Sequence, residues 1–306
     1  MRLIQLRQER DFGQKINATF QFVGQNFKSL LTILLYTVVP FALIGGILQA
    51  LMQFQLQKTI RDVTGSGDYD RSDPVGSLMT IYTHMFETMF TSPYTLLSML
   101  FNFLTGILLS ISVLGFMIAY DESTEEPISV NTVINYIKKN VLTISVSTIV
   151  CLIIAAIGFI LFLIPGFYLV VVFSLVNMII IREGTGVFDS IGRAFRLISG
   201  KWWSTFGLIC IIGICIWMIT IAISIPLGIV SALQSYKSVQ SGEVSIGVLA
   251  ITSLTQVFSN LATAILHIAL GFQYFNLVEK KDGLGLQQQI NQIGQQTKST
   301  DEDGEY

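Results

Sequence analysis

Residues 141–181 read VLTISVSTIVCLIIAAIGFILFLIPGFYLVVVFSLVNMIII and contain no Asp, Glu, Lys or Arg. A helix of roughly 20 apolar residues crosses a bilayer core about 30 Å thick. The stretch is about twice that length, and Pro165 followed by Gly166 lies near its middle, where a Pro-Gly pair is a turn signal. It therefore predicts a helical hairpin of two membrane spans joined by a tight turn.

The composition of the whole chain points the same way. Hydrophobic residues make up 52% of the 306 residues and charged residues 12%, about half the share found in soluble domains. So few charges cannot cover a water-soluble enzyme of this size, and the high hydrophobicity excludes a disordered chain. The net charge of −2 leads us to expect no nucleic-acid partner.

Charge-free windows define the other spans, because a charged side chain is costly at the bilayer centre. With the hairpin, they predict an all-α polytopic membrane protein with six transmembrane helices. The predicted spans are roughly 29–53, 93–118, 141–163, 167–181, 203–230 and 246–276.

Lys and Arg set the orientation, since they are enriched in cytoplasmic loops. Placing both termini in the cytoplasm puts 14 of the 18 basic residues inside. These are Arg2, Arg7, Arg10, Lys15, Lys28, Lys138, Lys139, Arg182, Arg193, Arg196, Lys201, Lys280, Lys281 and Lys298. Lys58, Arg61, Arg71 and Lys237 fall outside. The sequence therefore predicts an N-in, C-in topology.

Three regions follow from this topology. Residues 1–28 form a cytoplasmic segment with an interfacial helix, and residues 29–281 form the membrane domain. Within that domain, an outer loop at about 55–92 contains Asp62, Asp68, Asp70 and Asp73 and a weakly helical stretch over 77–90. Residues 282–306 are polar and are expected to be a disordered cytoplasmic tail.

The joins before three pairs of spans look alike. Each has a short amphipathic segment that is expected to end at Asn26, Asn140 or Gly200, residue types that tolerate a left-handed conformation. The pattern is clearest over 187–198, where apolar residues recur at spacings of three and four. We expect three cytoplasmic interfacial amphipathic helices and a threefold repeat of helix plus hairpin. The alternative is a basic-then-apolar pattern shared by all proteins with short cytoplasmic loops.

Several motifs resemble a bacterial family. They are Leu163–Leu169 with its Pro-Gly pair, Arg182-Glu183-Gly184, the amphipathic stretch Ser190–Leu197 and Gly200-Lys201-Trp202-Trp203. Over residues 140–210 they resemble the membrane domain associated with glycerophosphoryl diester phosphodiesterases and related multi-pass proteins of unknown function. Ala194 stands where that family commonly has Ser.

The resemblance implies a bacterial cytoplasmic (inner) membrane location. It carries over no enzymatic activity, because no long polar region here could form the soluble phosphodiesterase domain.

Residues suited to catalysis are scarce. Some related proteins are labelled as carotene-cleaving oxygenases, which bind iron through four histidines, but this chain has only His84 and His267. No P-loop, zinc-protease or serine-hydrolase motif occurs. We therefore expect no enzyme, no catalytic residue, no cofactor and no metal site.

The last predicted span carries a polar stripe of Gln256, Asn260 and His267. Such a stripe either hydrogen-bonds a neighbouring helix or lines a cavity. Asn102 and Asn177, in other spans, are candidates to join it, and Ser224 and Ser231 share a helix face in the fifth span. His267 could bind a proton, but a neutral imidazole bonded to a neighbouring helix is the favoured interpretation.

A second candidate site lies at a cytoplasmic join. Arg182, Glu183, Arg193 and Arg196 are placed to form a structural ion pair or to bind a lipid headgroup. A structural ion pair between Glu183 and Arg193 or Arg196 is the favoured interpretation.

Two functions are compatible with these features. The first is a non-enzymatic protein that scaffolds or modulates a membrane partner or organises lipid, suggested by charge-free spans and interfacial helices. The alternative is a transporter or permease for a lipid-like or neutral small solute, suggested by the repeat, the Pro-broken spans and the polar stripe. The expected partners are the lipid bilayer and a membrane protein or a second copy of the chain.

Overall fold

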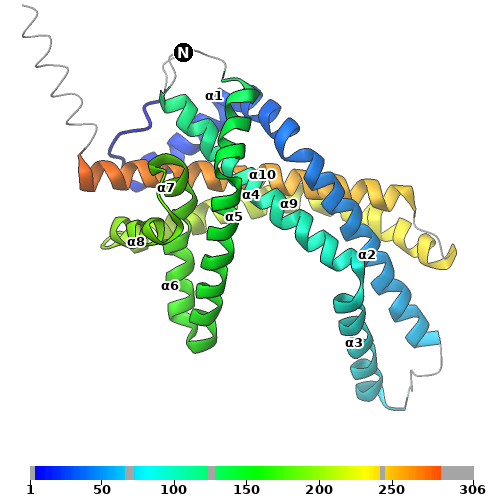
Figure 1. Cartoon of the computed structure of the whole chain (residues 1–306). Coiled ribbons are helices and arrows are strands. Elements are labelled where there is room, and N and C mark those ends of the chain that lie inside the picture. The colour runs from blue at the N-terminus through cyan, green and yellow to red at the C-terminus, as the bar shows by residue number, and fades with distance from the viewer. Residues whose placement is uncertain (1–3, 66–71, 123–127, 242–244, 284–306) are drawn as a thin grey trace, which may run out of the picture. The chain divides into compact units, whose positions relative to one another are not determined.

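The computed structural model describes residues 4–65, 72–122, 128–241 and 245–283, with the backbone alone for 235–241 (Figure 1). Over these ranges the chain forms ten helices and no strand, which confirms the all-α prediction. They are α1 (Phe12–Thr37), α2 (Val39–Gly65), α3 (Pro74–Thr91), α4 (Pro93–Glu122), α5 (Val130–Leu161), α6 (Leu163–Phe173), α7 (Val176–Glu183), α8 (Val187–Ile198), α9 (Trp202–Ser241) and α10 (Ile246–Asp282).

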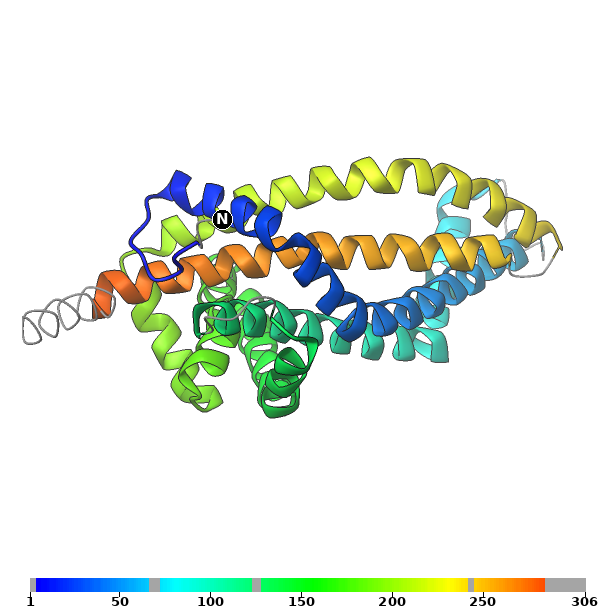
Figure 2. The ribbon, with the colours of Figure 1, turned by 90° about the horizontal axis from the view of Figure 1, so that it is seen from above.

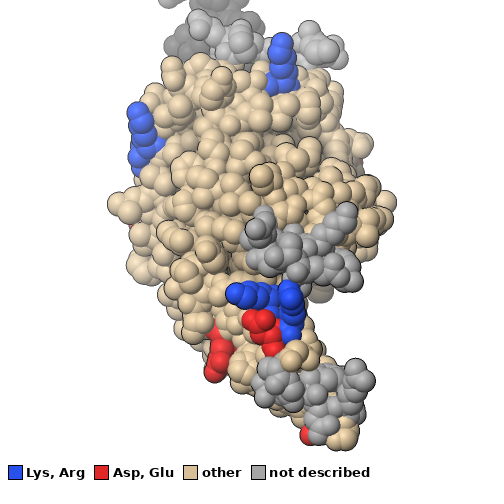
Figure 3. Space-filling model, turned by 90° about the vertical axis from the view of Figure 1, so that its right-hand side faces the viewer, with Lys and Arg blue, Asp and Glu red and all other residues tan. Residues whose placement is uncertain are grey.

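Six helical stretches in the described ranges are long and apolar enough to cross a membrane. They are Val39–Gly65, Pro93–Glu122, Val130–Leu161, Leu163–Glu183, Trp202–Gln234 and Ile246–Asp282. The face in Figure 3 carries few basic or acidic side chains over most of its surface, as expected for helices in contact with lipid. The chain is a multi-pass membrane protein.

The chain divides into two compact units. Unit 1 comprises residues 1–31, 110–214 and 265–306, and unit 2 comprises residues 32–109 and 215–264. The helices α1, α4, α9 and α10 each contribute residues to both. In Figure 2, α10 is continuous along its described length.

The core of unit 1 is built around Phe22 on α1, which is completely buried. Its ring makes edge-to-face contacts with Phe116 and Tyr120 on α4 and with Phe272 on α10, at centroid distances of 6.0, 5.0 and 5.8 Å. Edge-to-face pairs align the positive edge of one ring with the negative face of the other. One side chain therefore holds three segments that are far apart in the sequence.

The predicted hairpin forms in unit 1, but its turn lies earlier than expected. The helix α5 ends at Leu161, Phe162 is extended, and Pro165 and Gly166 lie in the first turn of α6. Proline fits there, since the first amides of a helix have no partner within it. Gly166 allows α6 to approach α5, because a Cβ on it would lie 2.4 Å from the ring of Phe159.

The prediction that Asn26 and Asn140 end helices is wrong. Both lie inside continuous helices, α1 and α5. The side-chain amides of Asn26 and Asn140 donate to the carbonyls of Phe22 and Tyr136, four residues earlier, and so remain satisfied within the helix. Of the three expected stops, only Gly200 follows a helix end, with a φ of +74°.

Two of the three expected interfacial segments are therefore continuous with the helix that follows them, and α8 is a separate helix. On α8, Ala194, Leu197 and Ile198 are fully buried, so these apolar residues pack on the protein rather than on lipid. The helices α5, α6 and α7 pack against α8.

The first predicted span, 29–53, is also divided. The helix α1 ends at Thr37 and α2 begins at Val39, just before Pro40, whose nitrogen cannot donate a helical hydrogen bond. The first candidate span is therefore α2, and the boundary moves toward the C-terminus by about ten residues.

The expected outer loop at 55–92 is largely helical. The helix α2 continues to Gly65, and α3 covers the stretch that was predicted to be weakly helical. Asp73 caps α3 by accepting a hydrogen bond from the Gly76 amide at 3.0 Å. Asp68, Asp70 and most of the predicted tail lie outside the described residues.

In unit 2, α2 and α10 approach closely at Gly46. A Cβ on Gly46 would lie 2.5 Å from the Cα of Ser253, a backbone atom that can move only if the helices separate. A Cβ on the adjacent Gly45 would lie no closer than 3.6 Å to any neighbouring atom, an ordinary contact.

We expect Gly46→Ala to lower the free energy of unfolding by about 1–3 kcal/mol, the usual cost of overpacking. Gly45→Ala is the matched control, because both changes gain the same helix propensity, about 1 kcal/mol. Denaturation in mixed detergent micelles, followed by tryptophan fluorescence, measures the difference. Equal stability of the two variants would contradict the close approach.

Candidate functional site

The polar stripe of the last span reaches a neighbouring helix in unit 2. The Gln256 side-chain amide donates to the Asn102 side-chain oxygen at 2.9 Å, so Asn102 of α4 joins the stripe as the sequence suggested. Gln256 and Asn102 lie at the edge of a cavity of about 570 Å³. It is lined by Gln49, Gln53, Asn102, Ser224, Leu227, Gly228, Ser231, Ile251, Thr252, Thr255 and Gln256.

The lining of this cavity, called here the unit 2 cavity, is polar but uncharged. It presents four side-chain amides and four hydroxyls, with no Asp, Glu, Lys, Arg or His among its described residues. Gln53, Ser224, Ser231 and Thr252 make no side-chain hydrogen bond to another described residue. At membrane depth such groups need partners, so we expect water or a ligand to occupy the cavity.

The helix α9 runs past the cavity without a break but lacks one backbone hydrogen bond there. Pro226 lies inside α9 and has no N–H to donate, so the carbonyl of Ala222 lacks its helical hydrogen bond. Ser224 precedes this proline, and Leu227 and Gly228 follow it on the cavity wall. A carbonyl freed in this way at membrane depth needs another donor, such as water or a ligand.

The other two residues of the stripe do not join the cavity. Asn260 donates to the carbonyl of Gln256 in its own helix at 2.9 Å. His267 belongs to unit 1, and no hydrogen bond to its imidazole is found within the described ranges. Asn177 also lies elsewhere, donating to the Ser110 hydroxyl at 3.0 Å in unit 1.

Cysteine labelling distinguishes a wet cavity from a packed interface. In a variant without Cys151, Cys210 and Cys215, we expect Thr255→Cys to react with a membrane-impermeant thiol reagent, because Thr255 lines the cavity. The adjacent Leu254→Cys is the control: Leu254 is 46% exposed but is not a lining residue, so lipid should protect it. Labelling of both cysteines, or of neither, would contradict a water-filled cavity.

The cytoplasmic join forms an ion-pair network in unit 1. Asp121 at the end of α4 lies 2.8 Å from Arg7 and 3.3 Å from Arg182, and its side chain is 9% exposed. Arg182 also pairs with Glu122. Asp121 and Glu122 therefore both lie against arginines.

Glu183 is the centre of the second part of the network. It accepts from Arg193 Nε at 3.3 Å and from the Tyr274 hydroxyl at 2.9 Å. Arg193 also pairs with Asp282. The structure therefore brings Arg182, Glu183 and Arg193 together, whereas Arg196 is exposed and forms none of the ion pairs found among the described residues.

Asp121→Asn should destabilise unit 1 by about 1–3 kcal/mol, because it leaves two guanidinium groups without their shared carboxylate. The free energy of unfolding in mild detergent measures this loss. Asp189→Asn on the exposed face of α8 is the control and should have little effect. If both variants unfold alike, the network contributes nothing to stability.

Sequence reasoning missed two buried cations near the N-terminus. Arg10 is 8% exposed and donates to the main-chain carbonyls of Leu6 at 3.1 Å, of Gln8 and of Gln5. Its guanidinium also lies 5.1 Å from the Phe272 ring. Burial lowers the pKa of Arg10.

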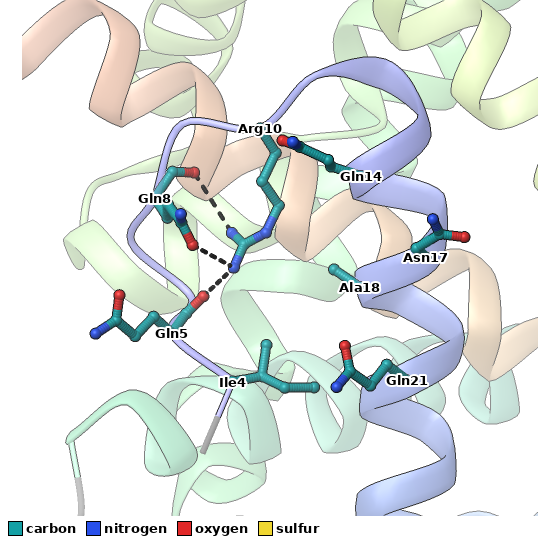
Figure 4. A pocket seen from close by; sticks show the side chains of 8 residues that line it. All are labelled: Ile4, Gln5, Gln8, Arg10, Gln14, Asn17, Ala18 and Gln21. Carbon is teal, nitrogen blue, oxygen red and sulfur yellow. Dashed lines mark hydrogen bonds between the residues drawn. The ribbon is translucent and has the colours of Figure 1, made fainter. Parts of the chain in front are cut away.

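Figure 4 shows Arg10 enclosed by the N-terminal segment, beside an open hollow of about 640 Å³ whose wall on α1 carries amide side chains. The guanidinium holds the N-terminal segment in its fold, and two contacts with α10 attach that segment to the domain: the Arg10 main-chain amide donates to Asn276 Oδ1 at 2.8 Å, and the guanidinium lies over the Phe272 ring.

Lys15 is the second missed residue. It is 2% exposed, and its ammonium donates to Gln273 Oε1 at 2.7 Å and to the Ser204 hydroxyl at 2.9 Å. A signal was present in the sequence, because Lys15 precedes Phe22 by seven residues and so shares its helix face. Because lysine is rarely buried, the sequence predicts instead that Lys15 lies in an exposed, basic cytoplasmic segment.

Comparison with protein-family models, with curated proteins and with solved structures gave no match. The resemblance to the phosphodiesterase-associated membrane domain stays a prediction. Among the described residues, no group of three His, Cys, Asp or Glu side chains is placed to hold a metal ion.

Proposed function

We propose that this chain binds a small, neutral, hydrogen-bonding solute in the unit 2 cavity and acts as a permease for it, without catalysis. The observation that carries the proposal is the uncharged polar lining within candidate membrane spans. Cavities of roughly 300–1,000 Å³ suit small-molecule ligands, and the cavity volume of about 570 Å³ falls in that range.

The lining restricts the chemistry of the solute. A charged solute would lose its hydration without meeting an opposite charge, which is costly in a low-dielectric site. A purely apolar solute would leave the Gln53 amide and the hydroxyls of Ser224 and Thr252 without water or another partner. A polyol, a sugar or a small amide would satisfy both donors and acceptors. The neutral-solute form of the permease hypothesis is therefore favoured over the lipid-like form.

We further propose that the chain lies in a bacterial cytoplasmic membrane with both termini inside. The distribution of Lys and Arg supports this orientation, because it places 14 of the 18 basic residues on the cytoplasmic side. The network of Asp121, Arg182 and Glu183 would then face the cytoplasm.

A scaffolding or lipid-organising role is a second candidate. It is favoured by the side chains that α8 and the start of α9 leave exposed, namely Phe188 at 75%, Trp203 at 77% and Arg196. Aromatic and basic residues of this kind are typical of membrane–water interfaces. Near-stoichiometric recovery of one membrane protein after gentle purification, lost on Phe188→Ser and Arg196→Gln, would support it.

The permease proposal is tested with purified protein and a panel of neutral polyols, sugars and small amides. We expect at least one to raise the thermal stability and to enter proteoliposomes containing the protein. Gln256→Leu and Thr252→Val should each weaken binding roughly three- to tenfold, the effect of one lost hydrogen bond.

Thr263→Val is the matched control, because Thr263 is on the same helix and bonds only to the carbonyl of Ser259 within it. The control should bind the solute as the unchanged protein does. If no neutral solute binds, or if the cavity variants bind like the control, the proposed function is wrong.

A further inference from the structure

The charge of Lys15 has no opposite charge beside it. Its ammonium contacts two neutral oxygens, those of Gln273 and Ser204, and lies 5.7 Å from the Phe12 ring. Gln273 in turn donates to the Thr205 hydroxyl at 2.8 Å, so these polar groups are fixed by one another. A buried cation in such surroundings is costly unless an anion lies nearby.

Two more lysines add to the positive charge. Lys201 directly precedes α9, whose first turn contains Ser204. Lys280 lies seven residues after Gln273 on the same face of α10. Both are exposed, and within the described ranges none of the salt bridges found involves Lys15, Lys201 or Lys280.

The backbone of α9 adds further positive charge near Lys15. The first amides of α9 carry a partial positive charge, and no acidic residue lies in the first turn of that helix. Lys15 therefore places a cation beside the end of a helix that attracts anions. Among the described residues, the acidic side chain that acts on Lys15 is Asp11, which is exposed and accepts a hydrogen bond from the Gln14 main-chain amide at 2.8 Å.

We propose that Lys15, Lys201, Lys280 and the first turn of α9 bind the phosphate of an anionic phospholipid. Lys201 and Lys280 contact the phosphate directly. The buried Lys15 does not contact it and contributes only its positive charge. This lysine site lies in unit 1 and does not depend on the solute cavity of unit 2.

The surroundings identify a lipid as the source of the phosphate. Lys201 is next to the start of one candidate span, and Lys280 is near the end of another, where phospholipid headgroups lie. Trp203 is 77% exposed beside Lys201, and Trp202 stacks on Phe206 with centroids 5.1 Å apart. Tryptophans at this depth mark the membrane–water interface.

The pKa of Lys15 gives the expected pH dependence. Burial, then the charges of Lys280 and Lys201, lower the pKa to about 8, whereas Asp11 acts to raise it. A bound anion favours the charged form. Binding should therefore weaken as the pH rises above about 8, and this weakening should be absent from Lys15→Met.

The two tryptophans provide a direct test with the full chain. In the Trp217→Phe variant, only Trp202 and Trp203 report. The protein is reconstituted in vesicles of phosphatidylcholine containing a small share of brominated phosphatidylglycerol or, for comparison, of brominated phosphatidylcholine. We expect stronger fluorescence quenching by the anionic lipid, weakened by salt.

Lys201→Gln and Lys280→Gln should each reduce this selectivity about fivefold, the effect of one lysine near a charged surface. Both side chains are exposed, so these variants should fold. Lys138→Gln with Lys139→Gln is the control, since those exposed lysines lie on α5, and it should keep the selectivity.

Three results would overturn the proposal. One is equal quenching by the two brominated lipids. Another is selectivity that survives the loss of both Lys201 and Lys280. The third is competition by inorganic phosphate at low millimolar concentration, which would assign the site to a soluble anion instead of a lipid.

Discussion

The cost of leaving a polar group without a partner in hydrocarbon governs this structure. The backbone avoids this cost by forming helices, since a helix satisfies its own amides and carbonyls. Polar side chains avoid it by bonding within their own helix. Examples are the hydroxyls of Thr105, Ser145 and Thr263, each of which donates to the carbonyl four residues earlier. Most polar residues of the spans are thus satisfied within their own helix and place no demand on a neighbour.

Several charged residues lie near helix ends in unit 1, where they form ion pairs with one another. Asp121 joins the N-terminal segment to α4 and α7, and Glu183 joins α7 to α8 and α10. These interactions join residues far apart in the sequence, and the aromatic contacts of Phe22 hold α1, α4 and α10 together inside the unit. Both aromatic packing and ion pairs therefore stabilise unit 1.

Hydropathy was sufficient to predict the spans and the hairpin, because charge is excluded from the membrane regardless of tertiary structure. Helix boundaries were harder. Asn26 and Asn140 have the composition of helix stops, but their side chains found a carbonyl within the helix, and no sequence pattern decides between the two outcomes.

The candidate site was predicted only in part. Gln256 could be predicted because it shares a helix face with Asn260. Ser224 and Ser231 could be predicted because they share a face of another helix, and Asn102 was a candidate to join the stripe. Gln49 and Gln53 could not be noticed, because α2 comes near α10 only through the missing side chain of Gly46. A close approach between helices depends on tertiary packing, which periodicity does not describe.

Around the unit 2 cavity, several polar side chains lack partners among the described residues, and this supports the proposed function. Around Arg10 and Glu183, donors are matched with acceptors, which rigidifies a structure and leaves nothing to bind a ligand. Within the described ranges, the unit 2 cavity keeps hydroxyls and an amide without partners, close to the helical hydrogen bond that Pro226 removes from α9. Polar groups without partners lower the stability of a membrane protein. A ligand that completes their hydrogen bonds offsets this loss only in the conformations that bind the ligand. Under the proposed permease function, solute binding beside Pro226 would be coupled to the conformation of α9, as transport requires.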